Sequence, residues 1–158
     1  MLPDDFFSAD CVVTSLDLQS KKRLLEHVAD LFAASNPELQ ANDIFDKLIE
    51  RERLGSTGLG KGIALPHARI DGLNRARGVF IKLEKPVDFD AMDNQPVDLV
   101  VALIVPSDAN NEHLKILAGL ASVFVDESNC DKLRKLSDKQ QVIDLLQHSL
   151  ETSLSIAS

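Results

Sequence analysis

The sequence predicts one α/β domain in which helices flank a mixed β-sheet. Apolar residues recur at helical spacing over residues 20–34, and the runs at 77–84 and 98–106 have the composition of strands. The run at 98–106 is apolar at almost every position, which is typical of a strand covered on both faces. No repeat, low-complexity tract or linker-like stretch interrupts the chain, so we expect a single domain over residues 1–158 with its core at about 10–150.

The individual elements follow from periodicity and from stop signals. The second helix should begin after a cap at Asn42 or Asp43 and end by Leu54, because Gly55 is a natural stop. A further helix should follow Pro106, which ends the last strand. The expected strands cover residues 62–65, 77–84 and 98–106. The expected helices cover residues 20–34, about 43–54, about 111–125, about 128–136 and 139–150.

Composition and charge argue against several kinds of partner. The net charge is −8, no basic block is present, and seven Phe without Trp or Tyr offer few stacking platforms, so nucleic acid is not expected as a partner. No apolar run reaches about eighteen residues and no secretory signal pattern is visible, so we expect no membrane insertion and a cytoplasmic protein. Cys11 and Cys130 lie far apart, without a CxxC or metal spacing, and are interpreted as reduced thiols.

The stretch GSTGLGKGIALPH at residues 55–67 looks at first like a phosphate-binding loop. Its first seven residues fit the P-loop pattern, but Gly62 stands where that loop needs a Ser or Thr to bind magnesium. A P-loop also leads from a strand into a helix, whereas this stretch leaves a helix and enters a strand-like run that ends at Pro66. The dinucleotide pattern G-x-G-x-x-G is absent. We therefore expect neither ATP nor NAD, and no cofactor.

Two of the four histidines are candidates for chemistry. His67 follows a short strand, a proline and the glycine-rich segment, where backbone amides can approach an anion. His113 lies in the first turn of its helix and leans toward the body of the protein. If the strands before these histidines are parallel and adjacent, both rings meet at the carboxyl edge of the sheet. His27 and His148 fall on the polar sides of their helices and are expected at the surface.

Other uses of these residues remain open but are weakly supported. The two histidines could bind a metal such as zinc, yet no Cys and no HxH or HExxH spacing accompanies them, so no metal site is predicted. No serine lies on a G-x-S-x-G turn, which leaves a hydrolase triad without its nucleophile. Arg53 and Lys61 are most simply solvated.

The run ERLGSTGLGKGIALPHA at residues 52–68 resembles the active-site signature of the fructose/mannitol-type enzyme IIA proteins of the bacterial phosphotransferase system. Three other stretches resemble one branch of that family, the nitrogen-regulatory enzyme IIA: QSKKR at 19–23, RERLGSTG from Arg51, and FDAMDNQPVDL at 89–99. The resemblance covers about residues 10–148, and we expect no fused sugar-specific B or C domain. It implies the fructose/mannitol-type enzyme IIA fold.

The resemblance also implies a function, that of a phosphotransferase component that acts as a phosphohistidine carrier and is not a classical turnover enzyme. His67 would accept a phosphoryl group on Nε2 from the histidine phosphocarrier protein of a nitrogen branch, in a relay that starts from phosphoenolpyruvate. The supporting residues of the family fall on Arg51, Thr57 and His113. Regulatory targets such as potassium transporters or sensor kinases would respond to the phosphorylation state. The alternatives are a sugar-transport enzyme IIA that phosphorylates a permease B domain, and an interaction module whose histidine no longer reacts.

Phosphoryl transfer to a neutral imidazole needs orientation more than a separate base, since the ordinary histidine pKa is about 6.5. A backbone carbonyl should hold Nδ1–H, although the sequence does not say which. We expect His113 and Thr57 to donate to the phosphoryl oxygens and Arg51 to supply positive charge. Leu65, Pro66 and Ala68 should form an apolar rim around His67 that excludes water.

Overall fold

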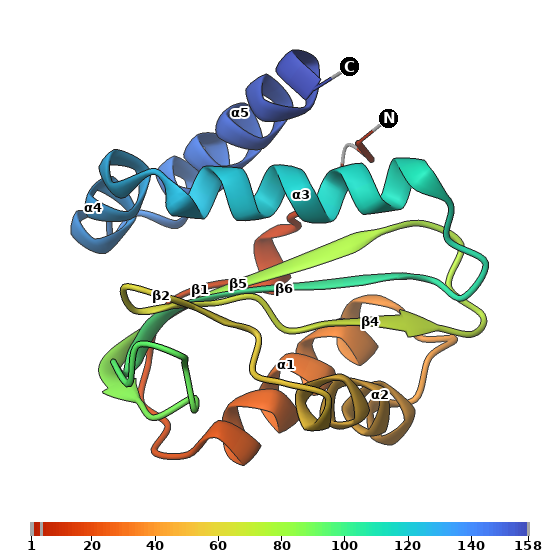
Figure 1. Cartoon of the computed structure of the whole chain (residues 1–158). Helices are drawn as coiled ribbons and strands as arrows, with labels where there is room; N and C mark the ends of the chain where they lie inside the picture. Colours follow the sequence, from red (N-terminus) through yellow and green to blue (C-terminus); the bar gives the residue numbers. More distant parts are fainter. Residues whose placement is uncertain (1, 4, 158) are drawn as a thin grey trace.

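The computed structural model describes residues 2–3 and 5–157, and it confirms the predicted α/β fold with helices on both faces of a mixed sheet (Figure 1). The strands are β1 (Val12–Leu16), β2 (Gly58–Gly60), β3 (Ile63–Ala64), β4 (His67–Ile70), β5 (Arg77–Val87) and β6 (Val97–Pro106). The helices are η1 (Ala9–Cys11), a 3-10 turn, and α1 (Lys21–Ser35), α2 (Ala41–Arg53), α3 (Asn111–Val125), α4 (Glu127–Lys135) and α5 (Lys139–Ala157).

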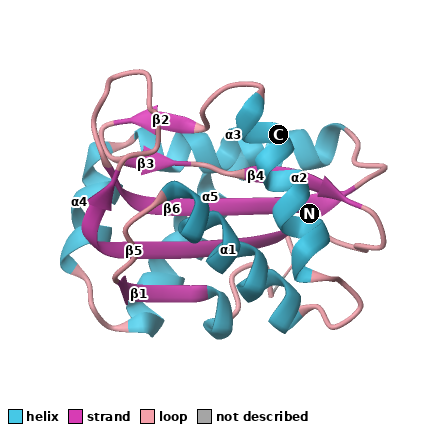
Figure 2. Ribbon diagram, turned by 90° about the horizontal axis from the view of Figure 1, so that it is seen from below, coloured by secondary structure: helices cyan, strands magenta, loops and turns pink. Residues whose placement is uncertain are grey.

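The sheet is built around the antiparallel pair β5 and β6, and its strand order is β1-β5-β6-β3-β2 (Figure 2). β1 runs parallel to β5 at one edge. On its other side β6 has two parallel partners in succession, first β3 and then β4. The residue at the start of β4, His67, therefore lies opposite Leu103, and the strands before the two candidate histidines are parallel and adjacent as expected.

The sheet separates two apolar cores. In Figure 1, α1 and α2 cover one face, and α3, α4 and α5 cover the other. Successive side chains of a strand point to opposite faces, so β6 contributes to both cores. The core under α1 and α2 takes Val100, Ala102 and Ile104, and the core under α3 to α5 takes Leu99, Val101 and Leu103. The apolar run predicted as a strand covered on both faces is confirmed.

The predicted elements differ from the observed ones mainly at their ends. The helix at 111–125 is confirmed at both bounds, whereas α2 begins at Ala41, earlier than a cap at Asn42 or Asp43 would allow, and its N-cap Gln40 makes no side-chain bond. The last helix continues to Ala157 rather than ending near 150. Three short strands, β1, β2 and β4, were not predicted, because strands of three to five residues leave too few positions for a periodic pattern.

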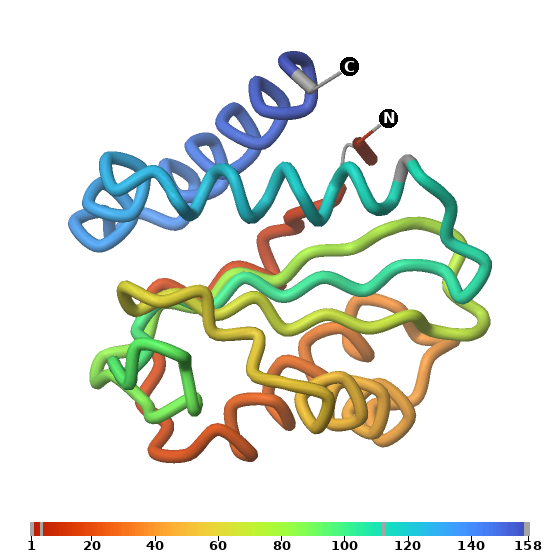
Figure 3. Tube along the Cα trace, in the orientation of Figure 1, coloured from red at the N-terminus to blue at the C-terminus, as the bar shows by residue number. Residues whose placement is uncertain are grey.

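The chain between α2 and β4 crosses from the helical layer to the sheet. Figure 3 shows this segment leaving the end of α2, turning at β2 and running back along the sheet edge toward β4. The segment contains all of the glycine-rich stretch and ends on His67. It connects the last turn of α2 to the start of β4. Within the described residues, no helix has the length and apolarity needed to cross a membrane.

Candidate functional site

The glycine-rich stretch forms a tight hairpin. β2 and β3 pair antiparallel, and the last residue of β2 and the two residues that join the strands all have positive φ: Gly60 at 91°, Lys61 at 56° and Gly62 at 86°. Glycine adopts such angles without the penalty that a Cβ brings, so backbone geometry accounts for two of the glycines. The amide of Lys61 donates to Asp93 Oδ2 at 2.8 Å, which joins the hairpin to the loop before β6. The hairpin carries the chain to His67.

His67 is held in one tautomer by its two ring contacts. Its Nδ1 lies 2.9 Å from the carbonyl oxygen of Leu65, and Arg51 Nε donates to its Nε2 at 3.3 Å. A carbonyl oxygen only accepts, so Nδ1 carries the proton, and Nε2 presents a lone pair to the guanidinium. The Leu65 carbonyl is thus the backbone group that orients the ring.

The surroundings of His67 favour the neutral ring. Burial lowers the pKa of His67 below its ordinary value, and the positive charge of Arg51 lowers it further. The hydrogen bond to the Leu65 carbonyl and the charge of Glu52 act in the opposite direction without reversing the shift. A neutral imidazole keeps its Nε2 lone pair, so the ring stays nucleophilic to a lower pH than a solvated histidine would.

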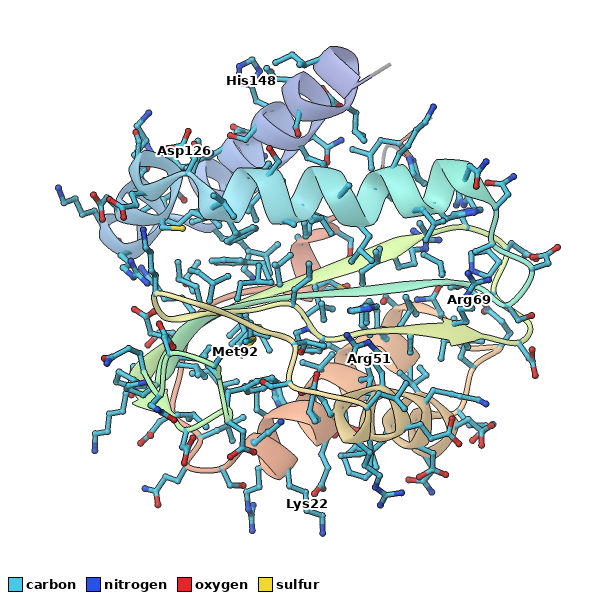
Figure 4. The ribbon with its side chains drawn as sticks, viewed as in Figure 1. Lys22, Arg51, Arg69, Met92, Asp126 and His148 are labelled. Carbon is cyan, nitrogen blue, oxygen red and sulfur yellow. The ribbon has the colours of Figure 1, made fainter. Side chains whose placement is uncertain are left out.

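Arg51 links the end of α2 to the histidine. It lies in the last turn of the helix, and its Nη1 donates to the Gly55 carbonyl at 2.9 Å while its Nε faces His67. Figure 4 shows its side chain between α2 and the sheet. Because the guanidinium is planar and donates from both Nε and Nη1, it has little freedom to rotate away from His67. The predicted positive charge therefore lies against the ring of His67.

His113 lies in the first turn of α3, as predicted, and lines the same cleft as His67. Its Nδ1 accepts the backbone N–H of Asn110 at 3.3 Å, which places the ring proton of the neutral form on Nε2. The two histidines come together because β4 and the start of α3 flank the end of β6. His67 lies alongside β6 rather than beyond its edge, because β4 extends the sheet from that residue.

The cleft has a volume of about 460 Å³ and combines apolar walls with charged side chains. Two leucines on opposite sides of it are exposed, Leu54 by 85% and Leu114 by 52%. The apolar rim predicted from Leu65, Pro66 and Ala68 is wrong for the first two, which are buried and do not line the cleft. The charged and polar lining comes from Lys47, Glu50, Arg51, His67, Arg69 and His113.

Thr57 lies behind the cleft. It is 4% exposed, its amide donates to Glu52 Oε1 at 3.1 Å and its hydroxyl donates to Glu52 Oε2, and it is absent from the cleft lining. A direct contact between Thr57 and a group on His67 would require its hydroxyl to leave Glu52. The structure therefore brings Arg51, His67 and His113 to one cleft and places Thr57 against a buried carboxylate.

Glu52 is the site residue that the sequence analysis did not single out. Its side chain is 5% exposed, and it contacts Lys21 Nζ at 2.9 Å in addition to Thr57. One sequence signal was available: a carboxylate in the last turn of a helix opposes the helix dipole, so such a residue needs another reason for its position. Over the described part of the chain, no three or more His, Cys, Asp or Glu side chains are grouped to hold a metal ion.

Comparison with known proteins identifies the family. A family model described as "Phosphoenolpyruvate-dependent sugar phosphotransferase system, EIIA 2" matches residues 5–149. The chain belongs to this family. Among EIIA type 2 relatives, the "Nitrogen regulatory protein" of Pseudomonas aeruginosa is 47% identical over 115 residues, which cover 73% of this chain and 75% of that protein. The "Nitrogen regulatory protein" of Escherichia coli is 41% identical over 138 residues, which cover 87% and 84%.

Solved structures of EIIA proteins share the fold. The nitrogen regulatory protein IIA-Ntr from Neisseria meningitidis has a TM-score of 0.86 at 39% identity, over 90% of this chain and 97% of that one. The IIA mannitol protein of Escherichia coli has a TM-score of 0.73 at 22% identity, over 89% and 98%, and at that identity the likeness shows the fold alone. The resemblance to the nitrogen-regulatory branch of EIIA type 2 is confirmed.

Proposed function

We propose that this EIIA type 2 protein carries a phosphoryl group on Nε2 of His67, which it accepts from a histidine phosphocarrier protein in a phosphoenolpyruvate-dependent relay. One observation carries the proposal: the Leu65 carbonyl occupies Nδ1, while Nε2 faces a cleft that Arg51 and His113 also line. The carrier role fits a phosphotransferase-system component. It requires neither a metal nor a cofactor.

The proposed transfer is a displacement at phosphorus between two imidazoles. The Nε2 lone pair of His67 attacks the donor's phosphohistidine, whose ring carries a proton on its other nitrogen; a new N–P bond forms, and the old N–P bond breaks to return a neutral imidazole to the donor. No proton has to move, since Nδ1–H stays on the Leu65 carbonyl, which stabilises the positive charge that the ring gains. As the phosphoryl group arrives, Arg51 must break its hydrogen bond to His67 Nε2 and donate to the phosphoryl oxygens instead.

The charge that develops on the equatorial oxygens needs donors, and two are close. Arg51 supplies a fixed positive charge at the end of α2, and His113 in the cleft can donate from Nε2–H. The exposed Leu54 and Leu114 offer the apolar surface on which a small donor protein would dock and exclude water. In this proposal Thr57 acts through Glu52.

The proposed task is regulation. The relatives with the highest identities quoted above are nitrogen regulatory proteins, and a phosphorylated His67 would change the charge of the cleft and so the choice of partner. We propose a cytoplasmic protein whose targets are regulatory proteins such as potassium transporters or sensor kinases. The second candidate is sugar transport, favoured by the "PTS system fructose-specific EIIA component" of Haloferax volcanii, 33% identical over 132 residues. Sugar uptake in a deletion strain separates the two.

The test is a reconstituted relay. We expect the protein to become labelled when it is incubated with phosphoenolpyruvate carrying a labelled phosphoryl group, enzyme I and the phosphocarrier protein. His67→Ala should abolish the label, and His148→Ala, at an exposed position on α5, should leave it unchanged (Figure 4). His113→Ala should slow labelling or onward transfer. Label that persists in His67→Ala, or that never appears in the wild-type protein, refutes the proposal.

A further inference from the structure

A partly buried ion pair behind the cleft joins three distant parts of the chain. Lys21, the first residue of α1, places its Nζ 2.9 Å from Glu52 Oε1, at the end of α2. The same Nζ lies 3.3 Å from the Phe89 carbonyl oxygen, 4.5 Å from the centre of the Phe89 ring and 3.6 Å from Asp90 Oδ2. These contacts unite the three stretches in which the sequence resembles the nitrogen-regulatory branch.

The Glu52 carboxylate contacts donors from two separate parts of the chain. Lys21 reaches it from α1, and Thr57 donates to it from both its amide and its hydroxyl. A side chain that accepts two bonds from one residue fixes that residue closely. The chain reversal from the end of α2 to β2 is therefore anchored on Glu52.

The anchored reversal holds Arg51 in turn. Gly55 lies between Glu52 and Thr57, and its carbonyl oxygen accepts from Arg51 Nη1 at 2.9 Å. Arg51 Nε then faces His67 Nε2 at 3.3 Å. Ser56 also donates to the Phe89 carbonyl at 2.8 Å. The reversal is therefore bonded to the same carbonyl oxygen that Lys21 contacts. A continuous path of short contacts leads from Lys21 to the nucleophile.

The position of Glu52 is unfavourable for an ion pair that only stabilises the fold. Glu52 stands in the last turn of α2, where the helix dipole disfavours a carboxylate, and burying a charge costs free energy that its partners must offset. A carboxylate at this position is explained if the chain reversal that it anchors serves to place Arg51 against His67. Lys21 offsets the cost of burying it.

We propose that Lys21 and Glu52 are positioning residues for the phosphoryl transfer: together they fix the reversal at residues 53–57, and through the Gly55 carbonyl they hold Arg51 against Nε2 of His67. Neither residue lines the cleft. Lys21 acts only through Glu52 and the loop. Glu52 also exerts a field on the His67 ring.

The inference rests on the proposed function, and its test has two independent readouts. The first is the rate at which the phosphocarrier protein labels the variants Glu52→Gln and Lys21→Met. A displacement of about 1 Å at a reacting group costs up to about a hundredfold in rate, so we expect a loss of about tenfold or more in each variant. Lys22→Met is the matched control, because Lys22 is exposed on the same helix and points away from the molecule (Figure 4).

The second readout is the titration of the His67 ring by NMR, which needs no transfer reaction. The groups around the ring are Arg51 and Glu52 from α2, with Lys47, Glu50, Arg69 and His113 along the cleft. Because Arg51 lowers the pKa of His67, its release in Lys21→Met should raise that pKa, and Lys21→Met should cause no further rise in an Arg51→Gln background. Lys22→Met should leave the pKa where it is in the wild type. A variant that merely loosened the fold would expose the ring and raise the pKa in the Arg51→Gln background as well.

The outcomes separate the two proposals. Slow labelling of both variants, with normal labelling of Lys22→Met and a His67 pKa that Lys21→Met raises only when Arg51 is present, supports the inference. Wild-type rates and an unmoved pKa overturn it while the carrier function stands. If the wild-type protein is not labelled at all, the carrier function fails, and the titration still decides whether the Lys21–Glu52 pair holds Arg51 against His67. The double variant should be no slower than the slower single one, since both changes break the same path.

Discussion

At the scale of single residues, the chemistry of the site depends on which nitrogen of His67 is free. Both ring nitrogens have a partner, but the partners differ in kind: the Leu65 carbonyl can only accept, and the Arg51 guanidinium can only donate. This pair of contacts selects one tautomer and aims its lone pair into the cleft. In the proposed function, Arg51 would have a second role before transfer, because its Nε–H occupies the Nε2 lone pair until the phosphoryl group arrives.

The Arg51 charge makes a prediction about the pKa of His67. Arg51→Gln should raise that pKa, because removing a cation next to the ring removes one of the causes that lower it. Arg53→Gln is the matched control, since Arg53 is exposed two positions further along α2. An NMR titration of the imidazole measures both. An unchanged or lower pKa in Arg51→Gln would contradict the contact between Arg51 and Nε2.

The lowered pKa of His67 also fixes the sign of its pH effects. The unfolded chain binds this proton at a pKa of about 6.5, above that of the folded state, so the stability that His67 contributes is present above about pH 6.5 and is lost as the pH falls through its folded pKa. The rate of phosphoryl acceptance should follow the same titration, because only the neutral ring has a free lone pair.

At the scale of elements, the hairpin of β2 and β3 sets where β4 begins and so where His67 lies. Gly62 has a φ of 86°, and a Cβ built on it would lie 2.7 Å from Asp98 Oδ1 and 2.8 Å from Arg134 Nη2. Those two atoms belong to a pair of hydrogen bonds, both of 2.8 Å, between Arg134 on α4 and Asp98 on β6. The glycine thus allows the hairpin to approach an ion pair that ties α4 to the sheet.

Replacing that glycine should destabilise the protein. Gly62→Ala combines an unfavourable φ with a clash against the Asp98–Arg134 pair, and we expect the free energy of unfolding to fall by about 1–3 kcal/mol. Denaturant unfolding measures this change. Lys61→Gly, in the same turn at a φ of 56°, should keep a stability near that of the wild type, since glycine adopts this angle freely. Equal losses in both variants would count against the proposed clash.

At the scale of the whole molecule, the cleft lies at an edge of the sheet, between the helical layers on its two faces. It opens between α2, β4 and the start of α3, whereas α4 and α5 complete the core on the face that α3 covers (Figure 1). Both cores take alternate residues of β6. His67 therefore lies next to β6, a strand buried along most of its length, where close packing limits the displacement of the backbone.

The sequence predicted the long elements and the identity of the cleft residues better than the connections between them. Helices of fifteen residues such as α1 and α3 repeat their apolar stripe often enough to be recognised, whereas β4 has only four residues and begins at His67 itself. The contact between His67 and the Leu65 carbonyl spans two positions, and the Lys21–Glu52 ion pair joins residues more than thirty positions apart. The periodicity of apolar residues carries no information about either contact.

Thr57 illustrates the same limit. Its place in the motif indicated a role at the site, but the local sequence does not determine whether its hydroxyl faces the cleft or the interior. The structure turns it toward Glu52, because a buried carboxylate needs donors. A carboxylate in the last turn of α2 was the visible sign that this part of the chain is organised around something other than helix stability.

The central claim is that Nε2 of His67 receives the phosphoryl group while Nδ1 stays on the Leu65 carbonyl. The most direct measurement is NMR of the intact protein, labelled with ¹⁵N and phosphorylated by the relay, which identifies the ring nitrogen bonded to phosphorus. We predict phosphorus on Nε2 of residue 67, with chemical-shift changes concentrated at the end of α2, the glycine-rich stretch, β4 and the start of α3, and little change in α5. Phosphorus on Nδ1, or on any other residue, would contradict the account.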